Sequence, residues 1–186
     1  MNISKYNFLF ILLAGIFTFS SCGDDPQPED PEEVITTLIY TLTPVSGGNN
    51  VVLTFRDIDG DGGNAPDITG GTLATNTVYQ GAITLSNESE DPAEDITAEV
   101  RDEDLDHQFF FSSSLSDLNV TYSDTDPNGN PIGLATSVST GAAGNGTLTV
   151  ILRHQPDKNA AGVRDGEILN AGGETDIEVI FNVTVE

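Results

Sequence analysis

From residue 34 onward, apolar and polar residues alternate with a period of two along much of the chain. The clearest run lies at the C-terminus, where Ile177, Val179, Phe181, Val183 and Val185 are separated by mostly polar residues. Successive side chains of a strand point to opposite faces, so this alternation predicts a half-buried strand. Comparable runs predict strands at 38–42, 51–56, 79–85, 118–122 and 147–153, with a weaker candidate at 132–139.

A run of three aromatic residues, Phe109-Phe110-Phe111, places rings on both faces of a further strand, which is typical of a strand covered on both sides. We interpret these rings as core residues rather than as a platform for a ligand. Clusters of Gly and Asn at 47–50, 69–71, 141–146 and 170–173 separate the runs. About eight short strands with such turns predict a single antiparallel β-sandwich, Ig-like or similar.

One segment has the pattern of a helix instead. Asp91-Pro92-Ala93-Glu94 offers an N-cap, a proline at the first helical position and a capping-box Glu. Ile96 and Val100 then lie four residues apart, on one face. The pattern predicts a helix over 92–104 that crosses the sandwich with an acidic outer face.

The N-terminal segment has the pattern of an export signal. Lys5 is followed by an apolar run over 8–19, which is shorter than the ~20 residues that span a bilayer as a helix. Phe19-Ser20-Ser21-Cys22 resembles the lipobox of bacterial lipoproteins, in which the Cys becomes the acylated first residue. We therefore predict a lipoprotein signal peptide over 1–21 and a lipid anchor at Cys22. The alternative is ordinary secretion with a free thiol.

An acidic, proline-rich tether is predicted over 22–33, because Pro, Asp and Glu without apolar partners cannot pack. It resembles the export signal that follows the lipidated Cys in surface-exposed lipoproteins. The sequence thus predicts an outer-membrane protein that faces the cell exterior. The alternative is a plain spacer and a domain that faces the periplasm. The β-sandwich domain would then cover residues 34–186.

Charge and composition narrow the classes of function. The 186 residues include 30 Asp and Glu against 6 Lys and Arg, a formal charge of −24, which disfavours nucleic-acid binding. One Cys excludes a disulfide framework and a Cys-rich zinc site. No G-x-S-x-G motif or Lys-containing phosphate loop occurs, so we predict that the protein is not an enzyme.

Two acidic turns match the opening half of a calcium-binding loop, D-x-[DN]-x-[DN]-G. Their candidate ligands are Asp57, Asp59 and Asp61 in the first turn, and Asp124, Asp126 and Asn128 in the second. The position that carries a bidentate Glu in an EF-hand is Ile68 after the first motif and Ala135 after the second, so neither is an EF-hand. We predict structural Ca²⁺ at these turns. The alternative is that Asp, Asn and Gly simply favour hairpin turns.

The two histidines, His107 and His154, are candidates for a different site. If the strand order brings them together, they would form a transition-metal site with a nearby carboxylate. The other interpretation is that both are surface or turn histidines.

With these features in view, the chain resembles small lipoproteins of Bacteroidota-type bacteria, especially over 55–66 and 170–177. Similar proteins are sometimes described as having a type 1 periplasmic binding fold, which needs two βαβ lobes and about twice this length. The resemblance implies an accessory role beside a TonB-dependent outer-membrane receptor. We therefore predict a non-enzymatic binding module with calcium-stabilised loops. The alternative is a metal-handling accessory protein of such an uptake system that uses His107 and His154.

Overall fold

The computed structural model describes residues 33–60 and 62–186. The predicted signal peptide, Cys22 and the tether up to residue 32 lie outside this part of the chain. The described elements are β1 (Thr37–Pro44), β2 (Val51–Arg56), β3 (Asp67–Thr69), β4 (Gly71–Leu73), β5 (Val78–Ser86), α1 (Ile96–Asp102), β6 (His107–Ser113), β7 (Asn119–Tyr122), β8 (Ala135–Ser139), β9 (Gly144–His154), the 3₁₀ turns η1 (Val163–Asp165) and η2 (Ile168–Asn170), and β10 (Glu174–Val185). No helix in this part of the chain is long and apolar enough to cross a bilayer.

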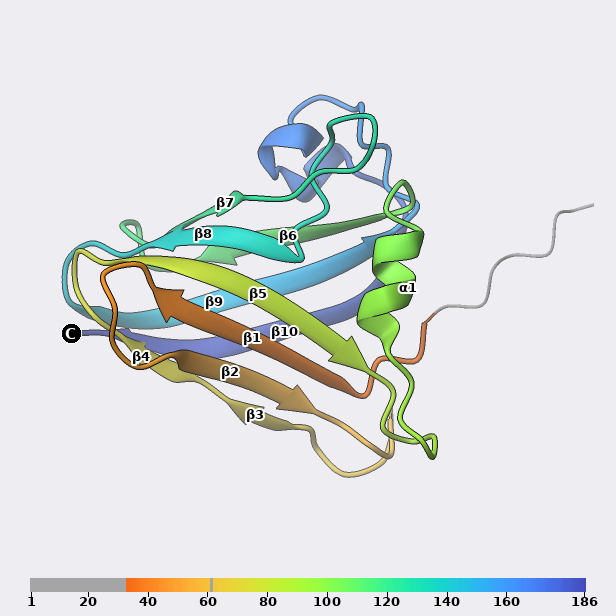
Figure 1. The fold of residues 1–186 in the computed structure, drawn as a ribbon, viewed down its shortest axis with the longest axis horizontal. Helices are drawn as coiled ribbons and strands as arrows, with labels where there is room; N and C mark the ends of the chain where they lie inside the picture. Colours follow the sequence, from red (N-terminus) through yellow and green to blue (C-terminus); the bar gives the residue numbers. More distant parts are fainter. Residues whose placement is uncertain (1–32, 61) are drawn as a thin grey trace, which may run out of the picture. The chain divides into compact units, whose positions relative to one another are not determined.

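The strands form two sheets packed face to face, which confirms the predicted β-sandwich (Figure 1). The six-stranded sheet has the order β3-β2-β1-β5-β8-β7, and the four-stranded sheet has the order β4-β10-β9-β6. The strand pairs are antiparallel except β4–β10, which is parallel. The chain changes sheets at Gly70, where a Cβ would lie only 1.9 Å from the carbonyl oxygen of Asn182. The 69–71 segment is therefore a crossing between two short strands rather than a turn.

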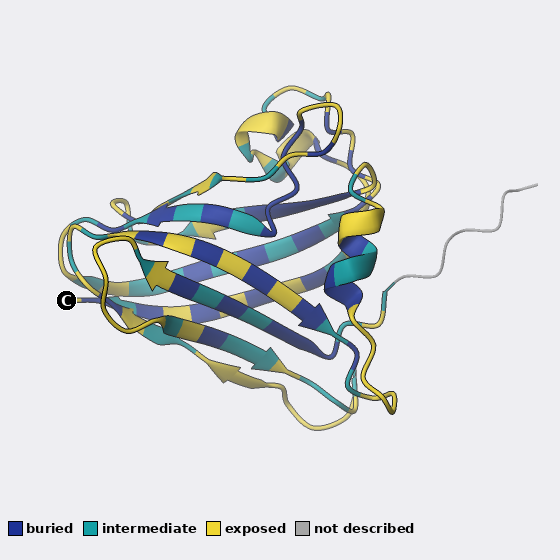
Figure 2. Ribbon diagram, viewed as in Figure 1, coloured by how far each residue is buried: buried dark blue, intermediate teal, exposed yellow. Residues whose placement is uncertain are grey.

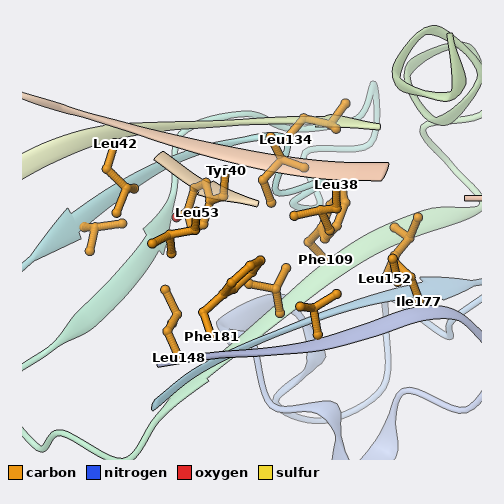
Figure 3. Packing of buried hydrophobic residues seen from close by; sticks show 14 of the residues in the cluster. Leu38, Tyr40, Leu42, Leu53, Phe109, Leu134, Leu148, Leu152, Ile177 and Phe181 are labelled. Atoms are coloured by element: carbon orange, nitrogen blue, oxygen red, sulfur yellow. The ribbon is translucent and has the colours of Figure 1, made fainter. Parts of the chain in front are cut away.

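The period-two alternation produces the core. Along β1 and β5, buried residues alternate with more exposed ones (Figure 2). Leu38, Tyr40 and Leu42 of β1 point across the gap toward Leu148 and Phe181 of the other sheet (Figure 3). Removing such side chains from water is the main favourable contribution to folding.

Strand β6 is covered on both faces, as the aromatic triplet predicts. Phe109 and the partly buried Phe111 pack in the main core. Phe110 points to the opposite face of the sheet and packs with Val163 and Ala171 in a second, smaller cluster. This cluster lies under the segment that carries η1 and η2 and connects β9 to β10. That segment therefore covers the outer face of the four-stranded sheet near the end of β9.

The helix is shorter than predicted and begins later. Glu94 exchanges backbone hydrogen bonds with Asn87 and is extended, so the chain becomes helical only at Ile96. The N-cap is Asp95, whose carboxylate accepts the N–H of Ala98 at 3.2 Å, and the predicted cap at Asp91 is wrong. Ile96 and Val100 are buried, as their spacing predicts. Helix α1 thus lies across one end of the sandwich (Figure 1).

Charge is distributed unevenly between the two ends of the sandwich. The loops at the α1 end, 57–60, 87–95, 103–106, 123–134 and 155–173, carry most of the described carboxylates. The loops at the opposite end, 45–50, 74–77, 114–118 and 140–143, contain one carboxylate, that of Asp117 (Figure 1). The α1 end is therefore strongly negative, and such a field raises the local concentration of cations.

Candidate metal centre

The fold brings the two histidines together at the α1 end of the sandwich. His107 begins β6 and His154 ends β9, and the register of these antiparallel strands places the two residues directly opposite each other. Their rings stack with centroids 4.8 Å apart. Both side chains face the interior, with His107 completely buried and His154 9% exposed. The interpretation of these residues as surface histidines is therefore wrong.

A carboxylate reaches the histidines through a β-bulge. In the β9–β10 pair, Thr175 is opposite Arg153 and Ile177 is opposite Leu152, so Asp176 is an extra residue in β10. Bulges redirect side chains locally and often occur beside functional sites. The Asp176 side chain is fully buried, with Oδ2 at 3.8 Å from His107 Nε2 and Oδ1 at 3.9 Å from His154 Nδ1.

A second carboxylate comes from the segment that precedes β1. Glu33 Oε1 lies 2.8 Å from His107 Nε2, and Glu33 Oε2 lies 3.8 Å from His154 Nδ1. The Glu33 side chain is only 6% exposed, so the predicted tether extends one residue too far. Glu33, His107, His154 and Asp176 each offer one ligand atom, and these four atoms lie within 4.8 Å of one another.

The orientation of His107 suits a metal ligand. Its Nδ1 lies 3.2 Å from the carbonyl oxygen of Glu103, just beyond α1. A carbonyl only accepts hydrogen bonds, so Nδ1 carries a proton and donates it. The lone pair of a neutral ring is then on Nε2, which faces the carboxylates. Metal-binding histidines commonly have their second nitrogen fixed in this way.

The pKa directions reflect close contact between acids and imidazoles. Burial is the largest single influence on the pKa of His107 and lowers it, but contact with Glu33, the Glu103 carbonyl and the charge of Asp176 together raise it above its usual value. For Glu33, burial is again the largest single influence, and it raises the pKa. The hydrogen bond to His107, a backbone hydrogen bond and the charges of the two imidazoles outweigh burial and bring the pKa of Glu33 below its usual value. The cluster therefore favours positive charge between its carboxylates.

The four candidate ligand atoms are close enough together to converge on one ion. Ligands ~2.1 Å from a tetrahedral Zn²⁺ lie about 3.4 Å from one another. Each imidazole nitrogen here has an oxygen of both carboxylates at 2.8 to 3.9 Å, with a different oxygen of each carboxylate facing each ring, and the four ligand atoms lie within 4.8 Å of one another. Two imidazole nitrogens with two carboxylates suit Zn²⁺ and related transition metals, whereas Ca²⁺ takes six to eight oxygen ligands.

The first acidic turn is held by its own hydrogen bonds. Asp57 Oδ1 accepts the N–H of Gly60 at 3.1 Å. Asp59 Oδ2 accepts both the backbone and the side-chain N–H of Asn64, at 2.9 and 2.7 Å, and these bonds lower the pKa of Asp59. Asp61 lies outside the described residues. Calcium binding at this turn stays a prediction.

In the second acidic turn, most carboxylate oxygens already accept hydrogen bonds from the protein itself. The two carboxylate oxygens of Asp124 accept the N–H groups of Gly133 and Ala135, at 2.8 and 2.9 Å. Asp126 Oδ1 accepts two further backbone N–H groups, and its Oδ2 lies 3.3 Å from the buried ammonium of Lys158. Asn128 has an exposed side chain. A lysine ammonium thus faces Asp126 where the calcium prediction requires an ion. Calcium binding at this turn also stays a prediction.

This ion pair leads to a stability prediction. Lys158 Nζ also contacts the carbonyl oxygens of Asp104 and Pro131. Asp126→Asn would leave this buried ammonium without its counter-charge, and we expect a loss of about 3 kcal/mol in the free energy of unfolding. Asp157→Asn is the control. Asp157 precedes Lys158 in the chain but is exposed, so this change should alter stability by less than about 0.5 kcal/mol. Equal effects of the two variants in urea unfolding would contradict the assignment.

The same substitution should also change how the free energy of unfolding depends on pH. Burial raises the pKa of Asp126, but hydrogen bonds from Asn130 and Lys158 outweigh it, so the folded pKa lies below the usual 3.8. The stability contributed by the ionised carboxylate is therefore present above pH 3.8 and is lost as the pH falls through the folded pKa. Unfolding of Asp126→Asn should depend less on pH in this acid range than unfolding of the wild type.

Two of the four cluster residues escape sequence reasoning. Glu33 ends an acidic run and is indistinguishable there from the other tether acids. Asp176 precedes Ile177 in an alternating strand, so simple alternation places it on the outer face, and only the bulge turns it inward. A weak signal did exist, since Asp176 lies in the 170–177 segment that carries the resemblance to lipoproteins.

Comparisons of this chain with protein-family models, with curated proteins and with solved structures found no match.

Proposed function

We propose that this protein binds a divalent transition-metal ion, with Zn²⁺ as the best-fitting ion, through Glu33, His107, His154 and Asp176. One observation carries the proposal: two imidazoles and two carboxylates converge in the interior with their ligand atoms within 4.8 Å. Two buried carboxylates are costly unless positive charge lies between them. A divalent ion supplies that charge and also uses the imidazole lone pairs.

The proposed role is binding rather than catalysis. Structural zinc sites have four protein ligands, whereas catalytic sites keep one position open for water or substrate. Here the chain supplies four candidate ligands whose ligand atoms lie within 4.8 Å of one another. The negative loops around α1 support the same role, because they attract cations toward this end of the sandwich.

The cellular setting is proposed from the sequence. We infer that Cys22 anchors the protein to the outer membrane through lipid and that the acidic tether presents the domain outside the cell, beside a TonB-dependent receptor. A metal-binding module at that place would serve an uptake system as an accessory protein. Protease treatment of intact cells tests the location, and a fully protected domain would argue for the periplasmic face instead.

Metal titration of the purified protein tests the proposed function. After treatment with a chelator, the protein should bind one Zn²⁺ per chain in calorimetry, and Co²⁺ should give the visible spectrum of a tetrahedral site. At 100 times the Kd, Zn²⁺ should stabilise the fold by about 2.7 kcal/mol and raise the Tm by about 5–10 °C.

The titration also separates this function from two alternatives. If protons alone neutralise the cluster, Zn²⁺ will neither bind nor raise the Tm. If Zn²⁺ instead binds at the acidic turns, Ca²⁺ will raise the Tm and displace the bound Zn²⁺. Either result would overturn the proposal.

A further inference from the structure

The four ligands of the cluster are not held equally. His107, His154 and Asp176 belong to β6, β9 and β10, which are neighbours in one sheet and are joined by continuous backbone ladders. Glu33 lies before β1, outside every strand, and the first backbone hydrogen bond after it is from Thr36 N–H to the carbonyl of Ser86. Three ligands are therefore fixed by the sheet, and the fourth is attached through a short irregular segment.

Glu33 also lies where solvent approaches the cluster. The side chains of His107 and Asp176 are fully buried, whereas those of Glu33 and His154 are 6% and 9% exposed. The next residue, Val34, is 58% exposed, so the site lies close to the protein surface at this point. Glu33 is thus one of the two cluster residues, with His154, whose side chains keep some contact with solvent.

The carboxylate of Glu33 is placed to close the site. Each of its two oxygens faces one histidine: Oε1 lies 2.8 Å from His107 Nε2, and Oε2 lies 3.8 Å from His154 Nδ1. Without Glu33, the remaining two histidines and one carboxylate form a three-ligand site with one coordination position open to water or another ligand. With Glu33, the site has four protein ligands.

We propose that Glu33 is the gating ligand of the metal site, displaced when the ion enters or leaves and bound when the site is loaded. This inference rests on the proposed metal binding. A bound divalent ion links Glu33 to β6, β9 and β10, so loading also fastens the segment that leads into β1.

Release kinetics test the gate. Zn²⁺-loaded protein is mixed with a chromophoric chelator, and the release rates of wild type, Glu33→Gln and Asp176→Asn are compared. Glu33→Gln should still bind one Zn²⁺ but release it at least tenfold faster, since even the loss of outer-shell partners costs about 10–100-fold in affinity. Asp176→Asn removes a fixed ligand and should weaken equilibrium binding more than Glu33→Gln does. Glu174→Gln, an exposed acid at the start of β10, is the control and should behave like wild type.

Hydrogen exchange gives a second, independent readout. Zn²⁺ should slow exchange of the Thr36 and Thr37 amides several-fold in wild type, because their bonds break when the leading segment opens, and it should not slow them in Glu33→Gln. Zn²⁺ binding with unchanged exchange at these amides, or with wild-type release from Glu33→Gln, would overturn the gate and leave the metal site intact. Absence of Zn²⁺ binding in wild type would overturn both proposals.

Discussion

His107→Gln is expected to abolish the rise in Tm that Zn²⁺ produces in the wild type. Gln is close to His in size and its amide can still donate to the carbonyl of Glu103, so the packing around this buried position should survive. It lacks the imidazole Nε2 that faces Glu33 and Asp176. Loss of an outer-shell partner already weakens metal sites by about 10–100-fold, so loss of a direct ligand should weaken this one by at least about 100-fold.

At a Zn²⁺ concentration 100 times the wild-type Kd, that weakening removes most of the expected 2.7 kcal/mol of stabilisation. The measurement is a pair of thermal melts, with Zn²⁺ and with chelator, for each variant. His154→Gln should give the same result because it removes the opposing imidazole. Glu178→Gln, two residues beyond Asp176 on an exposed position, should keep the full Zn²⁺ response. A full response in His107→Gln would show that Zn²⁺ binds elsewhere.

Phe181→Ala should have the largest effect on stability in the absence of metal. Phe181 is completely buried in the centre of β10, opposite Leu148 of β9, and points into the gap between the sheets (Figure 3). Truncation removes a large apolar side chain and leaves a cavity that the surrounding strands cannot refill. We expect a loss of about 4 kcal/mol in the free energy of unfolding and a fall in Tm of about 8–16 °C.

The neighbouring residue provides a matched control. Ile180 lies on the same strand but faces outward and is 52% exposed, so Ile180→Ala should cost less than about 1 kcal/mol. Urea unfolding of the two variants measures both changes in the free energy of unfolding, and the dependence of that free energy on urea concentration should be the same for both. Similar losses at the two positions would contradict the assignment of inner and outer faces along β10.

Most of the sandwich follows from local pattern. The alternation at 38–42, 79–85 and 177–185 predicts which residues of β1, β5 and β10 are buried, because strand geometry converts a period of two directly into two faces. Strands β3 and β4 escaped prediction since three residues are too few to show a period. The helix start was misplaced because Glu94 is paired with Asn87, a contact that no local propensity reports.

For the candidate site too, the sequence predicts some of the residues and the tertiary structure alone decides the rest. The sequence alone establishes a strongly acidic β-rich domain with two histidines near predicted strand ends, and it singles out His107 and His154 as metal candidates. It leaves open whether they meet, because the pairing of β6 with β9 is a contact across 47 residues of chain. Only the tertiary structure brings the two rings together, turns Asp176 inward through a bulge and folds Glu33 over them. Ligand geometry is a property of strand register and chain crossing, and neither is encoded in any single stretch of residues.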